Sequence, residues 1–190
     1  MTTATPPELF TPRLKLRMLD ERDTAAHYAV FSDPEVTRYW SSEPWTDIDQ
    51  AVQAIARITA ACADGSELRF GIELRETGEM IGNVCLHHFF ESSRRCELGY
   101  AIGSRHWGRG YVSEALKAAI GHGFAALDLN RIEADIDPRN GASARVLEKL
   151  GFRKEGYMPE RWIVHGEPAD TVNYGLLRRY WDELHRDGGA

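Results

Sequence analysis

The stretch that decides the fold is Tyr100-Ala101-Ile102-Gly103-Ser104-Arg105-His106-Trp107-Gly108-Arg109-Gly110-Tyr111-Val112-Ser113-Glu114-Ala115. It begins as a strand, turns at two glycines and continues as a helix. Gly108 and Gly110 have no Cβ, so their backbone can come close to a ligand. The first N–H groups of the helix point at the same place, with the positive end of the helix dipole behind them. The stretch therefore predicts an anion site between a strand and a helix.

Two arginines strengthen this prediction. Arg105 and Arg109 flank the turn, and each guanidinium can donate paired hydrogen bonds to phosphate oxygens. An ordinary tight turn with solvated arginines is the alternative, but the strand, the arginines and the helix start together favour a pyrophosphate site. The glycine spacing is that of neither a P-loop nor a dinucleotide-binding turn, and Val112-Ser113 does not supply the lysine and metal-binding group of a phosphotransferase. Those three nucleotide-binding classes are not supported.

The residues before this stretch predict a strand followed by helices. Residues 13–19 alternate as a half-buried strand does, and residues 20–31 have a helical pattern. Asp33-Pro34-Glu35 starts a second helix, with aspartate at the cap and proline in the first turn. A capping motif at residues 46–49 starts a third helix, which ends at Asp64-Gly65.

From residue 68 onward the pattern is that of a sheet with helices between its strands. The expected strands cover residues 68–75, 80–90, 96–103, 131–137, 152–164 and 170–177, with turns at 76–79 and 165–168. The expected helices cover residues 111–127 and 140–150, the second closed by Gly151. This order predicts a mixed α/β (α+β) fold on one sheet. We expect a single domain over residues 1–190, with flexible ends at about 1–8 and 185–190.

Composition excludes several classes of function. Of 190 residues, 43% are hydrophobic, which is enough for a core, and 29 acidic against 23 basic residues give a net charge of −6. Because no basic stripe stands out, nucleic-acid binding is not expected. The sequence shows neither a secretory signal nor a membrane-spanning stretch, so a soluble cytoplasmic protein is expected.

Cysteine and histidine spacing gives no metal site. Cys62, Cys85 and Cys96 match no zinc pattern and are expected to be reduced packing residues. His87 and His88 are neighbours on an expected strand, so they should face opposite sides and be unable to hold one metal ion together. Packing or solvent exposure is therefore the expected role of both histidines.

Arg-x-x-Gly-x-Gly at residues 105–110 resembles the pyrophosphate-binding signature of the GNAT acetyltransferases. Nearly the whole chain is similar to the subgroup of Rim-type ribosomal-protein alanine N-acetyltransferases. The similar blocks, in order, are Thr11-Pro12-Arg13-Leu14-Lys15-Leu16-Arg17, Ser32-Asp33-Pro34-Glu35-Val36, Glu97-Leu98-Gly99-Tyr100, Trp107-Gly108-Arg109-Gly110-Tyr111, Asn140-Gly141-Ala142-Ser143 and Glu148-Lys149-Leu150-Gly151-Phe152. Several separate blocks in the right order make the match specific.

The resemblance implies a mostly antiparallel sheet that is split into a V between its fourth and fifth strands, residues 96–103 and 131–137, and flanked by helices. It implies acetyl-coenzyme A (acetyl-CoA) as cosubstrate, with no metal, and with the pantetheine arm in the split. The implied cofactor-binding residues are Tyr100, Ala101, Ile102, Arg105, His106, Trp107, Gly108, Arg109, Gly110, Tyr111, Val112, Asn140 and Ser143. Asn140 is also a good helix cap, and both roles can hold at once.

For the chemistry, an amine must lose a proton before it can attack, because an ammonium ion has no lone pair. Glu97 matches the position of the general base in many GNAT enzymes, although a solvated strand glutamate is the alternative. A backbone N–H near Ile102 is expected to stabilise the oxyanion. Cys96 should face the opposite side from Glu97, so no covalent cysteine intermediate is expected.

One departure from the family concerns the leaving thiolate. The tyrosine that protonates it in many GNAT enzymes is replaced here by Leu147, which cannot donate a proton. Ser143, Tyr157 or water is expected to serve instead. A catalytically silent CoA-binding sensor or interaction module is therefore an alternative to an enzyme.

The family's acceptor groove is built from the first helices and the last hairpin. The residues expected there are Tyr39, Trp40, Trp45, Trp162 and Asp170. Packing in the core is the alternative for some of the aromatic residues, and capping of the strand is the alternative for Asp170. The expected function is direct transfer of acetyl, in a ternary complex, to the α-amine of a protein or peptide N-terminus. A small amine such as an antibiotic, a polyamine or an amino acid is the alternative acceptor. Both a monomer and a homodimer are allowed.

Overall fold

The first half of the sheet is an antiparallel array that follows chain order. In the computed structural model, which describes residues 7–186, β1 (Leu9–Phe10) pairs with β2 (Leu14–Arg17), and β3 (Glu67–Leu74) and β4 (Met80–Phe90) follow. β5 (Arg95–Ile102) then pairs with β4. The alternation of β2 buries Leu14 and Leu16 completely, as its sequence predicts.

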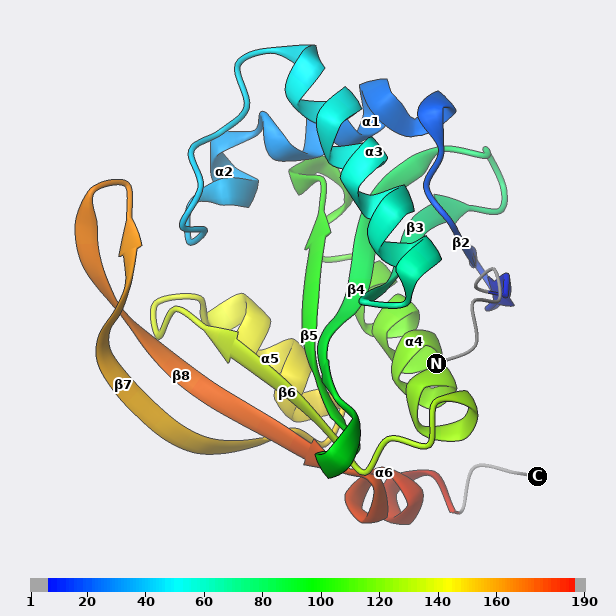
Figure 1. The fold of residues 1–190 in the computed structure, drawn as a ribbon, viewed down its shortest axis with the longest axis vertical. Helices are drawn as coiled ribbons and strands as arrows, with labels where there is room; N and C mark the ends of the chain where they lie inside the picture. Colours follow the sequence, from blue (N-terminus) through cyan, green and yellow to red (C-terminus); the bar gives the residue numbers. More distant parts are fainter. Residues whose placement is uncertain (1–6, 187–190) are drawn as a thin grey trace.

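The second half joins the first through one short parallel contact. β6 (Arg131–Ile136) pairs with β5 only at Arg95–Arg131, Cys96–Ile132 and Glu97–Glu133. β8 (Glu167–Leu177) pairs with β6, and β7 (Arg153–Val164) lies at the edge, giving the order β1-β2-β3-β4-β5-β6-β8-β7. Beyond Glu97 the two strands separate, and Figure 1 shows β5 and β6 diverging from a shared lower end. The predicted mixed, mostly antiparallel sheet with a V-shaped split is confirmed.

Helices cover both faces of the sheet (Figure 1). α4 (Tyr111–Ala126) and α5 (Gly141–Lys149) pack on one face. α1 (Thr24–Phe31), which follows a 3₁₀ turn at Glu21–Asp23, and α3 (Ile48–Asp64) lie on the other. The remaining helical segments are α2 (Pro34–Thr37), α6 (Arg178–His185) and 3₁₀ turns at Glu91–Ser93 and Ser104–His106. None of the helices in the described range is long and apolar enough to cross a membrane.

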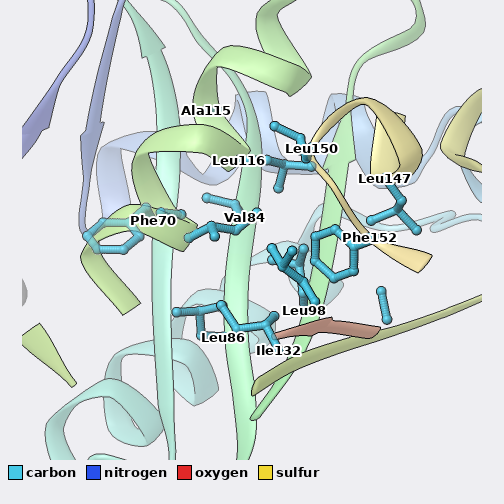
Figure 2. Packing of buried hydrophobic residues seen from close by; sticks show 14 of the residues in the cluster. Phe70, Val84, Leu86, Leu98, Ala115, Leu116, Ile132, Leu147, Leu150 and Phe152 are labelled. Carbon is cyan, nitrogen blue, oxygen red and sulfur yellow. The ribbon is translucent and has the colours of Figure 1, made fainter. Parts of the chain in front are cut away.

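The main core lies between the sheet and the face formed by α4 and α5. Figure 2 shows Leu98 and Ile132, from the two strands that meet at the base of the split, beside Leu116 of α4 and Leu147 of α5. Leu116, Ile132 and Leu147 are fully buried. Because both halves of the sheet contribute to one core, its packing holds the base of the V closed while the upper part stays open.

Two elements and one turn differ from the sequence prediction. β1 and α6 were not predicted, and the last hairpin turns on His165 and Gly166 alone, with β8 starting at Glu167. Both turn residues have positive φ, 51° and 81°, as a two-residue type I′ hairpin requires. The sequence does not indicate this turn, because His165 stands where the usual turn has asparagine or aspartate before the glycine, and Pro168 follows closely. Of the ends expected to be flexible, residues 1–6 and 187–190 lie outside the described residues.

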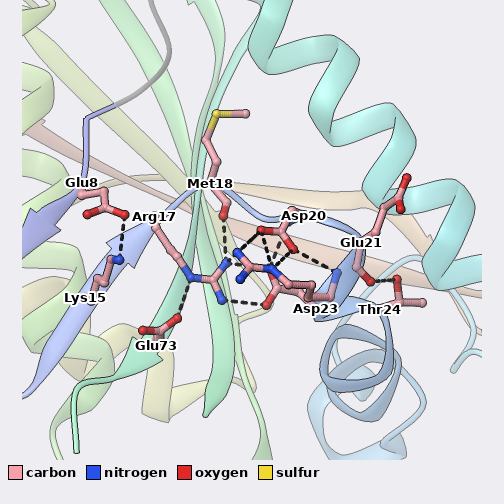
Figure 3. A network of polar contacts seen from close by, with 10 residues as sticks. Glu8, Lys15, Arg17, Met18, Asp20, Glu21, Asp23, Thr24 and Glu73 are labelled. Atoms are coloured by element: carbon pink, nitrogen blue, oxygen red, sulfur yellow. Dashed lines mark hydrogen bonds and ion pairs between the residues drawn. The ribbon is translucent and has the colours of Figure 1, made fainter. Parts of the chain in front are cut away.

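A buried ion network holds the first helices to the sheet (Figure 3). Arg17 donates from both terminal nitrogens to Asp23, at 2.7 and 2.8 Å, and from Nε to Glu73 on β3, at 2.5 Å. The Asp23 side chain is only 4% exposed. These hydrogen bonds, that to Asp23 above all, raise the pKa of Arg17 above its usual range. Asp23 thus depends on Arg17 for compensation of its buried charge.

Replacing Arg17 with Ala should destabilise the fold by about 3–5 kcal/mol, because Asp23 would remain buried without its cation. Arg22→Ala is the matched control: Arg22 also pairs with an aspartate, Asp20, but is 82% exposed, so little change is expected. Urea denaturation of the two variants measures the difference. Equal stabilities would show that the network does not hold the helices.

Candidate functional site

A cavity of ≈ 800 Å³ occupies the split between β5 and β6. Its walls come from the upper half of β5, the turn before α4, the start of α5, the end of β6, the segment around α2, and the β7–β8 hairpin. One continuous space therefore runs from the predicted anion site to the predicted acceptor groove.

The turn before α4 has the backbone conformation of an anion site. Gly108 and Gly110 both lie in the left-handed region, with φ of 72° and 79°, which side chains rarely adopt. Gly110 is the N-cap of α4, a helix of 16 residues, so the helix's first N–H groups open onto the cavity wall. Trp107 fixes the turn to β5, because its indole Nε1 donates to the Ile102 carbonyl at 2.9 Å.

His106 is a buried residue of this turn. Its side chain is 7% exposed and lines the cavity, and Arg105 Nε donates to its Nε2 at 3.1 Å. Burial lowers the pKa of His106, which favours the neutral ring. Its Nδ1 has no hydrogen-bond partner among the described residues and is covered by protein, so it is not open to a ligand in the cavity.

The two arginines that were expected to bind phosphate lie outside the cavity wall. The Arg105 guanidinium makes an ion pair with Glu79. Arg109 is exposed, and its backbone carbonyl accepts a hydrogen bond from Arg13 at 2.9 Å. Arg13 also pairs with Glu114 in the first turn of α4, at 2.6 Å. Sequence reasoning missed this link between the first strand and the turn, because nothing in the spacing connects residues a hundred positions apart.

The upper half of β5 presents backbone groups to the split. The Gly103 N–H donates to Ile81 on β4 at 2.9 Å, whereas the Ile102 carbonyl accepts from Trp107. Since backbone groups alternate along an antiparallel strand, the N–H groups of Tyr100 and Ile102 face away from β4 and toward the split. An extended chain with amide groups can pair with this edge as an added strand would.

A hydroxyl pair bridges the split. Tyr100 on β5 and Ser143 on α5 are joined through their side-chain oxygens at 2.6 Å, and both line the cavity. Burial raises the pKa of Tyr100 to about 12, so its hydroxyl keeps its proton at neutral pH. Asn140, the N-cap of α5, accepts from the Ser143 N–H at 3.1 Å and so positions that serine. Leu147 points into the core instead (Figure 2).

Glu97 lies at the point where β5 and β6 part. Its carboxylate lies 3.0 Å from His88 Nδ1, from which it accepts a hydrogen bond when that nitrogen carries the proton, and it lines a second cavity of ≈ 430 Å³. The two cavities share the walls formed by Ala134, Asp135 and Trp162. Cys96 faces the opposite side and is fully buried, and burial raises its pKa to about 12.

The prediction that His87 and His88 face opposite sides is wrong. Their ring centroids are 4.5 Å apart, and the donor atoms of His87, His88 and Glu97 all lie within 4.8 Å of one another. The cause is a β-bulge: the β4–β5 register shifts after His87, and His88 has a φ of 48°. The strict alternation on which the prediction relied does not hold at a bulge, and no glycine marks this one.

Four of the five residues implied for the acceptor groove meet at the far end of the larger cavity. Tyr39, Trp40, Trp162 and Asp170 are part of its wall. Trp45 instead packs against Phe31, with ring centroids 4.9 Å apart. Trp162 Nε1 donates to Asp135 at 2.8 Å, which ties the β7–β8 hairpin to the end of β6.

The sequence over residues 13–153 matches the acetyltransferase (GNAT) domain family. The chain belongs to the GNAT acetyltransferases. It is an acetyl-CoA-dependent N-acetyltransferase, and the prediction of family and enzyme class is confirmed.

The relatives differ in the acceptors that their names give. An uncharacterized N-acetyltransferase of Bacillus subtilis, YoaA, is 40% identical over 172 residues, covering 90% of this chain and 97% of the relative. The ribosomal protein uS5-alanine N-acetyltransferase of Escherichia coli is 31% identical over 91% of this chain and 92% of its own. The spermidine N(1)-acetyltransferase of the same species is 27% identical over 93% and 92%. Among solved structures, Mycobacterium smegmatis RimJ in complex with CoA-disulfide has a TM-score of 0.82, at 26% identity over 98% of this chain and 95% of that one.

Gly110→Val should weaken CoA binding by about tenfold or more, because a β-branched residue resists the left-handed backbone that aims the helix N–H groups. Gly166→Val is the matched control, since Gly166 also has a positive φ, of 81°, but lies in the β7–β8 turn. Calorimetric titration with CoA measures both variants. Unchanged affinity in a folded Gly110→Val protein would refute the anion site.

Proposed function

We propose that this enzyme transfers acetyl from acetyl-CoA directly to the α-amine of a protein or peptide N-terminus. The observation that carries the proposal is the single cavity through the β5–β6 split, which has an anion-binding turn at one end and an aromatic groove at the other. A cofactor and an acceptor that enter from opposite ends of such a cavity meet beside β5. Direct transfer in a ternary complex requires this arrangement, since both substrates must be present together.

The residues at the turn fit the cosubstrate. The N–H groups at the start of α4, behind the left-handed backbone of Gly108 and Gly110, suit the pyrophosphate of CoA. The backbone edge of β5 suits its pantetheine amides, and the N–H of Ile102, on that edge, is the proposed oxyanion donor. Arg109 is exposed and close enough to the turn to reach a phosphate by a change of rotamer.

The charges at the acceptor end are mixed, and the arginines among them suit the carbonyl groups of a peptide. Arg38 and Arg139 lie against the Tyr39 ring, at 5.5 and 5.8 Å from its centroid, and all three residues line the cavity. Asp137 is already neutralised by Arg139, and Asp170 accepts from Tyr157 and from the backbone of Glu160. Arg139 is thus paired, and Arg38 can donate hydrogen bonds to the carbonyl groups of a peptide, which a polyamine lacks.

Transfer requires the loss of two protons from the acceptor ammonium. The first loss frees the lone pair, which forms a C–N bond to the thioester carbonyl carbon as the C–S bond breaks and its electron pair stays on sulfur. We assign the removal of that proton to the site around Glu97. One proton must also reach the sulfur, and the Tyr100–Ser143 pair is the proton donor that we propose in place of the missing tyrosine at Leu147.

A small polyamine is the second candidate acceptor. Asp135 and Asp170 both line the larger cavity near Trp162, and an amine between them would gain two carboxylate partners. The relatives include a spermidine acetyltransferase, and spermidine is a polyamine. The two candidates differ in whether the acceptor carries one positive charge or several.

Release of free thiol from acetyl-CoA, followed with a thiol reagent, tests the acceptor. We expect release with peptides that carry a free α-amine and none with the same peptides acetylated at the N-terminus, which are the matched controls. Spermine and aminoglycosides should give at least tenfold lower kcat/KM, because they lack the peptide carbonyl groups to which Arg38 can donate. A higher kcat/KM for polyamines than for peptides would show that the acceptor is a polyamine. Absence of thiol release with every acceptor would favour a CoA-binding module that does not catalyse transfer.

Ser143→Ala and Tyr100→Phe should each lower kcat by about 10- to 100-fold while leaving the KM for acetyl-CoA within a few-fold, if the pair delivers the proton to sulfur. Acetyl thioesters of acidic thiols need less protonation, so the loss should shrink with a more acidic leaving group. Tyr180→Phe, which removes a tyrosine hydroxyl on α6 outside both cavities, is the control and should retain its rate. An equal loss with every leaving group would assign the pair a packing role only.

A further inference from the structure

The carboxylate assigned to deprotonation does not reach the larger cavity by itself. Glu97 lines the smaller cavity, whereas the larger one, where both substrates are proposed to meet, is lined on this side by His87. His87 on β4 and Glu97 on β5 are register partners, and their donor atoms lie within 4.8 Å. His87 therefore stands between the carboxylate and the cavity.

The Nε2 edge of the His87 ring lies beside a glycine. Gly99 lies two residues after Glu97, on the same face of β5, and it lines the larger cavity. A Cβ placed on Gly99 would lie 3.5 Å from His87 Nε2 and 3.9 Å from Cδ2. The absence of a side chain at residue 99 thus leaves the Nε2 edge of the imidazole uncovered on the cavity side.

The β-bulge at His88 completes the arrangement. With a φ of 48°, His88 leaves the strand alternation, stacks edge-on against His87 and binds Glu97 through Nδ1 at 3.0 Å. His88 is 66% exposed and lines only the smaller cavity. A non-glycine residue held in this conformation costs energy, and such costs are common where a site needs a particular geometry.

We propose that His87 is the group that accepts the proton from the acceptor amine, with Glu97 behind it as the carboxylate that stabilises the resulting imidazolium. The assignment rests on the proposed acetyl transfer. The ammonium gives one proton to Nε2 of His87, and the imidazolium then loses a proton to solvent by way of Glu97, which lines the smaller cavity. The nitrogen's second proton leaves as the amide forms, and one proton is returned to the sulfur of CoA, so that one proton is released for each acetyl transferred.

Histidine suits this step because it is neutral at the working pH. Burial, the largest influence, lowers the pKa of His87 below its ordinary value of 6.5. The charged and titratable groups around the ring are His88, Glu97, Arg69 and Glu67; His88 and Arg69 lower the pKa further, and Glu97 and Glu67 oppose them. The neutral, proton-accepting form therefore exists above that pKa. The rate should rise with pH around the pKa of His87, which lies below 6.5. Above that pKa, titration of His87 should cause no further increase in the rate.

The test compares the kcat of wild type, His87→Gln, His87→Ala and His88→Asn across pH, with saturating peptide acceptor and acetyl-CoA. We expect His87→Gln to lose about 100-fold or more in kcat, to lose the acid limb of the profile, and to keep its KM for acetyl-CoA. His88→Asn should keep the acid limb, since asparagine suits a positive φ and His88 lies outside the larger cavity. Free imidazole in the buffer should restore part of the rate of His87→Ala, which a purely structural role would not allow.

Three outcomes would overturn the assignment. The first is a His87→Gln rate within about threefold of wild type in a protein that still binds CoA. The second is an equal or larger loss in His88→Asn. The third is loss of the wild-type rate on treatment with a chelator, because His87, His88 and Glu97 would then hold a metal ion. Failure of the wild type to transfer acetyl to any acceptor would instead overturn the proposed function and this assignment with it. His185→Gln, which removes an imidazole outside both cavities, is the control for loss of a histidine.

Discussion

The pairing of β5 with β6 over only three residues is the constraint on which the rest of the structure depends. A longer ladder would satisfy the backbone groups of Tyr100 and Ile102 and close the sheet, leaving no space for a cofactor. A weaker contact at the base would let the two halves separate. The buried side chains on either side of that base, Leu98 and Ile132 among them, hold it in place from the α4 and α5 face. The cavity is thus a consequence of sheet topology and core packing together.

Different parts of the chain form the two ends of the cavity. The turn before α4 supplies N–H groups because two glycines adopt the left-handed backbone, and it is held in position by Arg13 and Trp107. The hydroxyls of Tyr100 and Ser143 face each other across the split because one comes from β5 and the other from the start of α5. The acceptor end combines α2 with the β7–β8 hairpin, so its shape depends on two elements that only the folded sheet brings together.

Sequence patterns predicted what depends on local chemistry. Gly108 and Gly110 revealed the turn, Asn140 revealed the start of α5, and alternation revealed the long strands and the class of fold. The patterns could not predict contacts between residues that are far apart in the chain. Examples are the ion pair between Arg105 and Glu79 and the hydrogen bond between Tyr100 and Ser143. His87 and His88 show a third limit, because a bulge without glycine overturns the alternation from which side-chain directions are inferred.

The central claim is that the split-facing edge of β5 binds the pantetheine arm as an added strand. Residue-resolved amide hydrogen exchange with and without CoA tests it most directly. The N–H groups of Tyr100 and Ile102 should exchange at least tenfold more slowly when CoA is bound, whereas those of Gly99 and Ala101, which face β4, should change little. Equal exchange at Tyr100 and Ile102 in the free and the CoA-saturated protein would contradict the account.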